Sequence, residues 1–128
     1  MEIKELVNQA HSAAKEKGWW EKPKSPLECH MLMVSELAEA TEEARKGTSP
    51  VYFETEHGPV TMEDLAGEMN CKQGEKQLKP EGELIELADT MIRIADYCGF
   101  MGWDLEKAIK SKMEYNETRS HRHGGKRY

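Results

Sequence analysis

Two short acidic segments of this chain carry side chains that can bind a metal ion. They are ELAE at residues 36–39 and ELAD at residues 86–89, and in each segment the two acids are three residues apart. On a helix this spacing places both carboxylates on one face, about one turn apart. Four carboxylates brought together repel one another by roughly 4 kcal/mol per close pair at an effective dielectric constant near 20, unless a cation compensates. Oxygen-only ligands favour hard cations such as Mg²⁺ or Mn²⁺. The predicted metal ligands are Glu36, Glu39, Glu86 and Asp89.

One acidic segment alone is more often a solvated helix face, because glutamate is a good helix former and pairs with neighbouring charges. Both segments of this chain, however, border an apolar stripe. Glu36 shares a stripe with Leu32, and Asp89 falls between Ile85 and Ile92 at helical spacing. The repetition of this arrangement on two helical segments favours a metal site over the solvated alternative.

The composition excludes several classes of protein. The chain has 128 residues, enough for one domain, and its formal net charge of −6 argues against a general nucleic-acid binder. It contains no long apolar run and no signal-peptide pattern at its start. Its three cysteines are scattered, without the CxxC pairs of a zinc site. We therefore expect a cytoplasmic protein with reduced thiols, no membrane contact and no stable nucleic-acid partner.

Apolar periodicity and capping residues predict four helices. They are expected over about 1–17, from 26 to about 46, from near Glu81 to Gly99 or Gly102, and from 105 to about 117. The second has the strongest start, because Ser25 can cap it, Pro26 suits its first position and Glu28 completes a capping box. The predicted fold class is therefore all-α, a four-helix antiparallel bundle in a single domain over residues 1–128.

An irregular insertion over residues 48–80 separates the second and third helices. Two short strands are expected in it at about 51–55 and 60–61, which would form a β-hairpin, and a short helix is expected from Thr61. The polar stretch 67–79 is predicted to be mobile. Residues 118–128 form a basic, glycine-containing tail.

Three blocks of sequence together resemble a known family. They are SELAEA at 35–40 followed by two further glutamates, PEG at 80–82 leading into ELAD, and KMEYN at 112–116 followed by Thr118, Arg119 and RHGGK at 122–126. In these blocks the chain resembles the MazG-like all-α nucleoside triphosphate pyrophosphohydrolases. The resemblance implies cleavage of a nucleoside triphosphate or deoxynucleoside triphosphate to the monophosphate and pyrophosphate, with Mg²⁺ held by the four acids. It also implies a homodimer or homotetramer. The insertion over residues 48–80 departs from the family, since it is longer than in the simplest members, and its expected role is a lid or an oligomer contact.

Residues for catalysis and substrate binding follow from the charges and from this resemblance. Glu39 is the predicted general base, accepting the proton of the attacking water. Lys112 and Asn116 are four residues apart, so they share a helix face on which they can clamp phosphate, and Arg119 can bind a further phosphate oxygen. Trp19 is a candidate for stacking a base, with core packing as the alternative for Trp19 and its neighbour.

Other readings of the same residues remain open. Basic groups at the end of a helix also complement its dipole, and for Arg122, Lys126 and Arg127 this alternative is as strong as phosphate binding. The chain could also be a related hydrolase of dUTP or of a nucleoside diphosphate. A third alternative is a non-catalytic helical module that binds a nucleotide, a metal ion or a basic partner.

Overall fold

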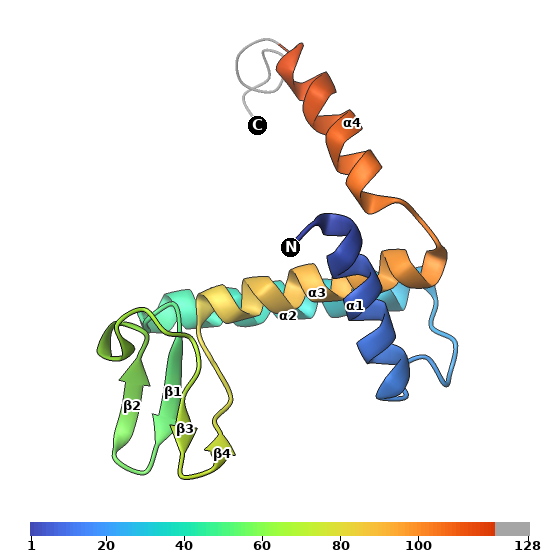
Figure 1. Ribbon diagram of the computed structural model, residues 1–128. Coiled ribbons are helices and arrows are strands. Elements are labelled where there is room, and N and C mark those ends of the chain that lie inside the picture. Colours follow the sequence, from blue (N-terminus) through green and yellow to red (C-terminus); the bar gives the residue numbers. More distant parts are fainter. Residues whose placement is uncertain (120–128) are drawn as a thin grey trace. The chain divides into compact units, whose positions relative to one another are not determined.

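The computed structural model describes residues 1–119, with four α-helices, a short 3₁₀ helix and two pairs of strands (Figure 1). In chain order the elements are α1 Ile3–Glu16, α2 Pro26–Lys46, β1 Tyr52–Thr55, β2 Gly58–Thr61, η1 Glu63–Leu65, β3 Lys72–Gln73, β4 Lys76–Gln77, α3 Glu83–Met101 and α4 Leu105–Glu117. The chain divides into two compact units. The central unit is Pro23–Ile94, and the terminal unit combines Met1–Lys22 with Ala95–Tyr128. No helix among the described residues is both long enough and apolar enough to span a bilayer.

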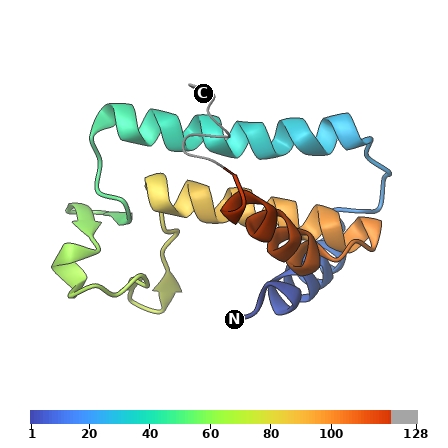
Figure 2. The same cartoon turned by 90° about the horizontal axis from the view of Figure 1, so that it is seen from above.

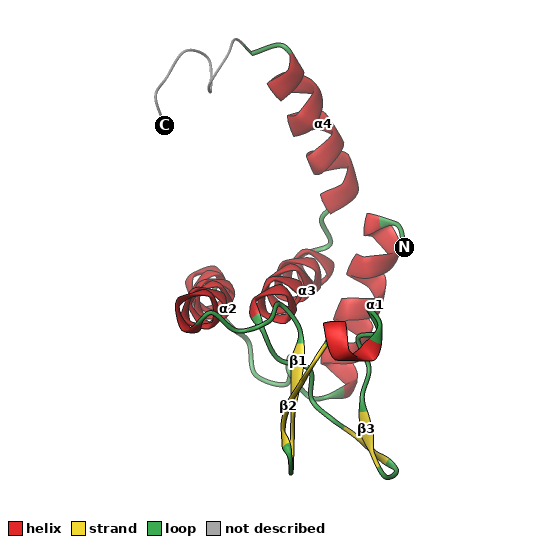
Figure 3. Cartoon of the chain, turned by 90° about the vertical axis from the view of Figure 1, so that its left-hand side faces the viewer, coloured by secondary structure: helices red, strands yellow, loops and turns green. Residues whose placement is uncertain are grey.

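The predicted fold class, an all-α four-helix antiparallel bundle, is wrong. Four helices are present near their predicted positions, but two antiparallel hairpins make the fold a mixture of helices and strands (Figure 3). The first hairpin pairs Tyr52 with Thr61 and Thr55 with Gly58, close to the two strands expected in the insertion. The second, β3–β4, falls in the stretch that was predicted to be mobile. Its two-residue polar strands have no apolar alternation to reveal them.

Local signals in the sequence define α2. The Ser25 side chain accepts a hydrogen bond from the Glu28 backbone N–H at 3.2 Å, and Pro26 occupies the first turn. Gly47 ends the helix at φ 70°, in the left-handed conformation that glycine adopts readily. In the central unit α2 and α3 lie side by side and run in opposite directions (Figure 2, Figure 3). The predicted helix start is thus confirmed, and the two acid-bearing helices face each other.

The insertion is tied to the ends of these two helices. The Tyr52 hydroxyl donates to Glu43 of α2, 2.9 and 3.0 Å from its two carboxylate oxygens. The backbones of Tyr52 and Glu81 exchange two hydrogen bonds of 2.9 Å, directly before α3. Phe53 is fully buried. Gly82 lies so close to the Pro50 carbonyl that an added Cβ would be 2.2 Å from its oxygen. These contacts hold α2 and the start of α3 in a fixed relation.

The terminal unit is built around the contact of α1 with the end of α3. Val7, Ala10 and Ala95 form its small apolar core, and partly buried side chains pack against it. Buried Asp96 accepts a hydrogen bond from the Trp20 indole N–H at 2.8 Å, and His11 Nδ1 lies 2.9 Å from the same carboxylate oxygen. This buried acid therefore has its hydrogen-bonding needs met within the unit.

Candidate metal centre

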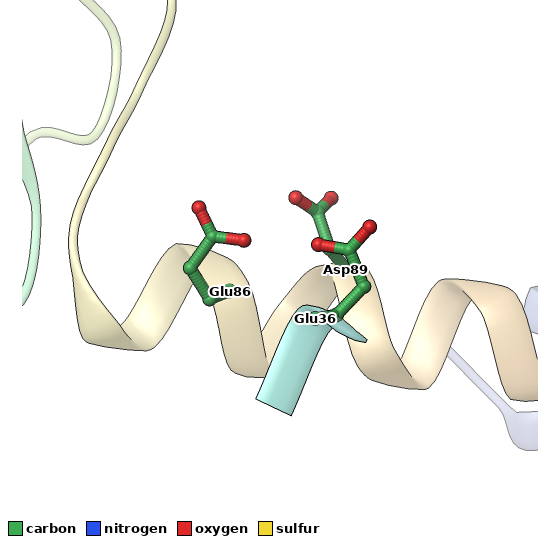
Figure 4. A group of neighbouring side chains, drawn as sticks. All are labelled: Glu36, Glu86 and Asp89. Atoms are coloured by element: carbon green, nitrogen blue, oxygen red, sulfur yellow. The ribbon is translucent and has the colours of Figure 1, made fainter. Parts of the chain in front are cut away.

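Three of the four predicted metal ligands meet in the central unit. Glu36 projects from α2, while Glu86 and Asp89 project from the same face of α3, one turn apart (Figure 4). Each residue contributes a carboxylate oxygen, and these oxygens all lie within 4.8 Å of one another. The spacing that predicted a shared helix face, together with the antiparallel pairing of the two helices, brings these acids to one place. We call Glu36, Glu86 and Asp89 the acidic cluster.

Glu39, the fourth predicted ligand and the predicted base, lies at the edge of the acidic cluster. Its side chain is exposed, and it does not belong to the group of three oxygens. Its carboxylate nevertheless lies close enough to Glu86 to raise the pKa of that residue. Glu39 is therefore a neighbour of the cluster that remains open to solvent.

Glu86 has the most strongly perturbed carboxylate of the acidic cluster. Burial, followed by hydrogen bonding with Glu39 and Glu36 and by the charges of Glu39 and Asp89, raises its pKa from 4.5 to about 7. Within residues 1–119, its Oε2 is the one buried side-chain nitrogen or oxygen that has no hydrogen-bond partner. A buried carboxylate oxygen in that position requires a proton or a cation.

The other two acids of the cluster are shifted in opposite directions. Burial, and then the charge of Glu36, raises the pKa of Asp89. Burial also acts to raise the pKa of Glu36, but the hydrogen bond from Arg93 and the interactions with Glu86 and Glu39 outweigh it, so the pKa is lowered. Arg93 Nε donates to Glu36 Oε1 at 2.8 Å. The cluster therefore contains one acid that is held ionised beside two that resist ionisation.

The sequence analysis missed Arg93, although a signal was present. Arg93 is four residues after Asp89 and seven after Glu86, so the three residues share one face of α3. It is also the one basic residue in an otherwise apolar stretch of that helix. The helical spacing of Arg93 from the two acids could have indicated that it lies beside them. Its partner on α2, Glu36, could be identified only from the structure.

The predicted substrate-binding residues on α4 belong to the terminal unit. Lys112 Nζ lies 4.9 Å from the centroid of the Tyr115 ring, and Arg119 Cζ lies 5.9 Å from it. Tyr115 is more than half exposed, and Asn116 is exposed beside it. The structure thus gathers two predicted cations around an aromatic ring that the sequence analysis did not single out. The acidic cluster belongs to the central unit.

The two neighbouring tryptophans have different environments. Trp20 stacks on Phe100, with ring centroids 4.0 Å apart, and its indole N–H is bonded to Asp96, so it serves packing. Trp19 is 37% exposed, and its proposed contact with a base stays a prediction. The residues Arg122, Lys126 and Arg127 lie outside the described part of the chain.

Comparisons with models of protein families, with curated proteins and with solved structures find no match for this chain. They therefore neither support nor oppose the resemblance to MazG-like enzymes. The acidic cluster consists of carboxylate oxygens from two facing helices, with one buried oxygen unpartnered, and this is the kind of donor set that a hard cation prefers.

Proposed function

We propose that this protein is a Mg²⁺-dependent nucleoside triphosphate pyrophosphohydrolase of the MazG-like kind. It would convert a nucleoside or deoxynucleoside triphosphate to the monophosphate and pyrophosphate. The observation that carries the proposal is the acidic cluster, with three carboxylates within 4.8 Å of one another and Glu86 Oε2 buried without a partner. Oxygen ligands suit Mg²⁺, and Mn²⁺ is the expected substitute.

Four acidic side chains of the central unit have roles in this proposal. Glu36, Glu86 and Asp89 would hold the cation, which requires the Glu86 carboxylate to be ionised. Bound Mg²⁺ supplies neutralisation of phosphate charge and a lower pKa for water. Glu39, exposed at the edge of the cluster, accepts the proton of the water that attacks the substrate. The anhydride bond between the α and β phosphates breaks, and pyrophosphate leaves.

The terminal unit contributes a surface whose chemistry suits a nucleotide. Lys112 and Arg119 flank the exposed ring of Tyr115, with Asn116 beside them. Cations bind phosphate oxygens, and an exposed aromatic ring can stack on a base. Within the terminal unit, this grouping is suited to a nucleotide ligand.

Product analysis tests the proposal. Purified protein is incubated with Mg²⁺ and a panel of triphosphates, dUTP and nucleoside diphosphates, and the products are separated by ion-exchange chromatography. We expect monophosphate and pyrophosphate in equal amounts, with the rate collapsing in Glu39→Gln. Glu42→Gln is the matched control, because Glu42 is an exposed glutamate of the same helix with a long ion pair of 3.7 Å to Arg45.

Other products would assign another reaction. Release of orthophosphate, or full activity in Glu39→Gln, contradicts the proposed reaction or the proposed base. Turnover restricted to dUTP or to a diphosphate would identify the related hydrolase instead. If Mg²⁺ raises the melting temperature while no nucleotide does, the chain is a metal-binding module without this activity.

We further propose that the protein acts as a homodimer or homotetramer in the cytoplasm. Apolar side chains at helical spacing are exposed on α2 and α3: Leu27, Met31, Val34, Leu37, Leu84, Leu87 and Met91. A row of this kind is unusual on a monomer. None of the three cysteines forms a disulfide, as suits a reducing compartment. Light scattering after size-exclusion chromatography tests the assembly, and a monomer at assay concentration would contradict it.

A further inference from the structure

Arg93 contacts the acidic cluster from the side. Its Nε donates a hydrogen bond to Glu36 Oε1 at 2.8 Å, and the two side chains are only 28% and 12% exposed. Two other pairs of a basic side chain with a carboxylate are different. Arg45–Glu42 and Lys110–Glu106 are 3.7 and 3.9 Å long, and their basic side chains are at least 73% exposed. The Arg93–Glu36 pair is therefore shorter than these two pairs, and its basic side chain is less exposed to solvent.

The bond acts on a carboxylate that belongs to the cluster. Glu36 is one of the three residues whose oxygens lie within 4.8 Å of one another. A charge-assisted hydrogen bond from a planar guanidinium fixes the plane of the carboxylate that accepts it. The bond from Arg93 engages Oε1 of Glu36, while the same carboxylate lies against Glu86 and Glu39 of α3 and α2. Ligating carboxylates are commonly oriented by such outer partners.

We propose that Arg93 is a positioning residue that holds Glu36 in the orientation required to bind the metal ion. This inference rests on the metal site of the proposed function. Arg93 could affect the metal in two opposite ways. As a positive charge alone it would repel a cation, so its removal would strengthen metal binding. As a positioning residue it favours binding, so its removal weakens binding.

Mn²⁺ titration followed by electron paramagnetic resonance separates these two roles. The full chain is compared as wild type, Arg93→Gln, Arg93→Lys and the exposed control Arg45→Gln. We expect Arg93→Gln to weaken Mn²⁺ binding about 10- to 100-fold, in line with other outer partners of metal ligands. Arg93→Lys should show a smaller loss, because it keeps a charged donor, and Arg45→Gln should bind as wild type does.

A second measurement excludes a general loss of folding. Circular dichroism and thermal melts in EDTA report whether each variant is folded. In the nucleotide assay, Arg93→Gln should require more Mg²⁺ for half-maximal rate, while its kcat at saturating Mg²⁺ stays close to wild type. Partial unfolding would lower the maximal rate without moving the Mg²⁺ dependence.

The outcomes distinguish this inference from the proposed function. If Arg93→Gln binds Mn²⁺ as tightly as wild type or more tightly, the positioning role is overturned and the metal site remains. If the wild type binds no Mn²⁺, both are overturned. If Mn²⁺ binding depends on Arg93 but no nucleotide is hydrolysed, the inference stands and the proposed activity fails. Should Arg93→Gln not fold, Arg93→Lys decides: weaker binding supports the role, and unchanged binding overturns it.

Discussion

Two acidic side chains, Asp96 of the terminal unit and Glu86 of the central unit, differ in whether their carboxylate oxygens have hydrogen-bond partners. In the terminal unit, Asp96 accepts a hydrogen bond from Trp20 and lies 2.9 Å from His11 Nδ1. In the central unit, Glu86 Oε2 is buried without a donor, and its neighbours are other acids. A buried acid with its bonds satisfied is sufficiently explained by packing. An unsatisfied one in an acidic cluster is not explained by packing in this way, and the proposed metal ion would supply its missing partner.

The largest expected effect is the loss of activity in Glu86→Gln. This variant removes one ligand of the proposed cation, so kcat/KM should fall by at least about 100-fold. In EDTA, by contrast, the free energy of unfolding should stay the same or rise, because a repelling buried charge is gone. Nucleotide assays and denaturant titrations measure the two quantities. If Glu86→Gln were strongly destabilised in EDTA, Glu86 would have a structural role like that of Asp96, and the prediction would be contradicted.

Asp96→Ala should show the reverse pattern. It leaves the Trp20 indole N–H and the His11 ring without their acceptor, so the free energy of unfolding should fall by about 2–3 kcal/mol. Mn²⁺ affinity of the folded protein should not change. Urea denaturation and Mn²⁺ titration below the melting temperature test this. Loss of Mn²⁺ binding in a folded Asp96→Ala protein would show that Asp96 also affects the metal site, which contradicts a purely structural role.

A smaller effect is expected where the insertion is tied to α2. Tyr52→Phe deletes the hydroxyl that bonds to Glu43, and this should reduce the free energy of unfolding by about 1 kcal/mol. Metal binding should be kept, because the variant leaves the acidic cluster intact. Thermal melts with and without Mn²⁺ check both points. An unchanged melting temperature would show that the bond contributes nothing to holding the insertion in place.

The smallest expected effect is a change in the pH dependence of stability caused by Glu86. Its pKa in the folded state is about 7, above the 4.5 of an unshifted glutamate. Without metal, the protonated Glu86 carboxyl therefore stabilises the folded state. This contribution to the free energy of unfolding is fully present below about pH 4.5 and is lost as the pH rises through 7. Mg²⁺ should raise the melting temperature more at pH 8 than at pH 5.5. A Mg²⁺ effect equal at both pH values, or a pH difference retained in Glu86→Gln, would contradict this assignment.

The sequence predicted the features that local patterns encode. Ser25, Pro26 and Glu28 give the start of α2 as expected, and Asp104 caps α4 through the Lys107 N–H at 2.9 Å. The i, i+3 acids of α3 share one face for the same local reason. These features depend on residues within one helical turn, so the sequence alone is sufficient to find them.

Features that depend on distant residues were not predictable in this way. Arg93 and Glu36 are 57 positions apart, and Asp96 meets His11 across 85 positions. Nothing in either local pattern specifies the partner. The all-α class was wrong because β3 and β4 are two polar residues each, held by a turn in which Gly74 has a φ of 65°. Such short strands follow from the turn and the surrounding fold rather than from an apolar pattern.

The most direct test of the metal site is a Mn²⁺ titration of the wild-type chain and of Glu86→Gln at pH 8. We expect saturable binding by the wild type, and at least about a 100-fold loss of affinity in the variant, because the cation would be the partner of the buried Glu86 Oε2. Equal binding by the two proteins, or no saturable binding by the wild type, would contradict the assignment of Glu36, Glu86 and Asp89 as a metal centre.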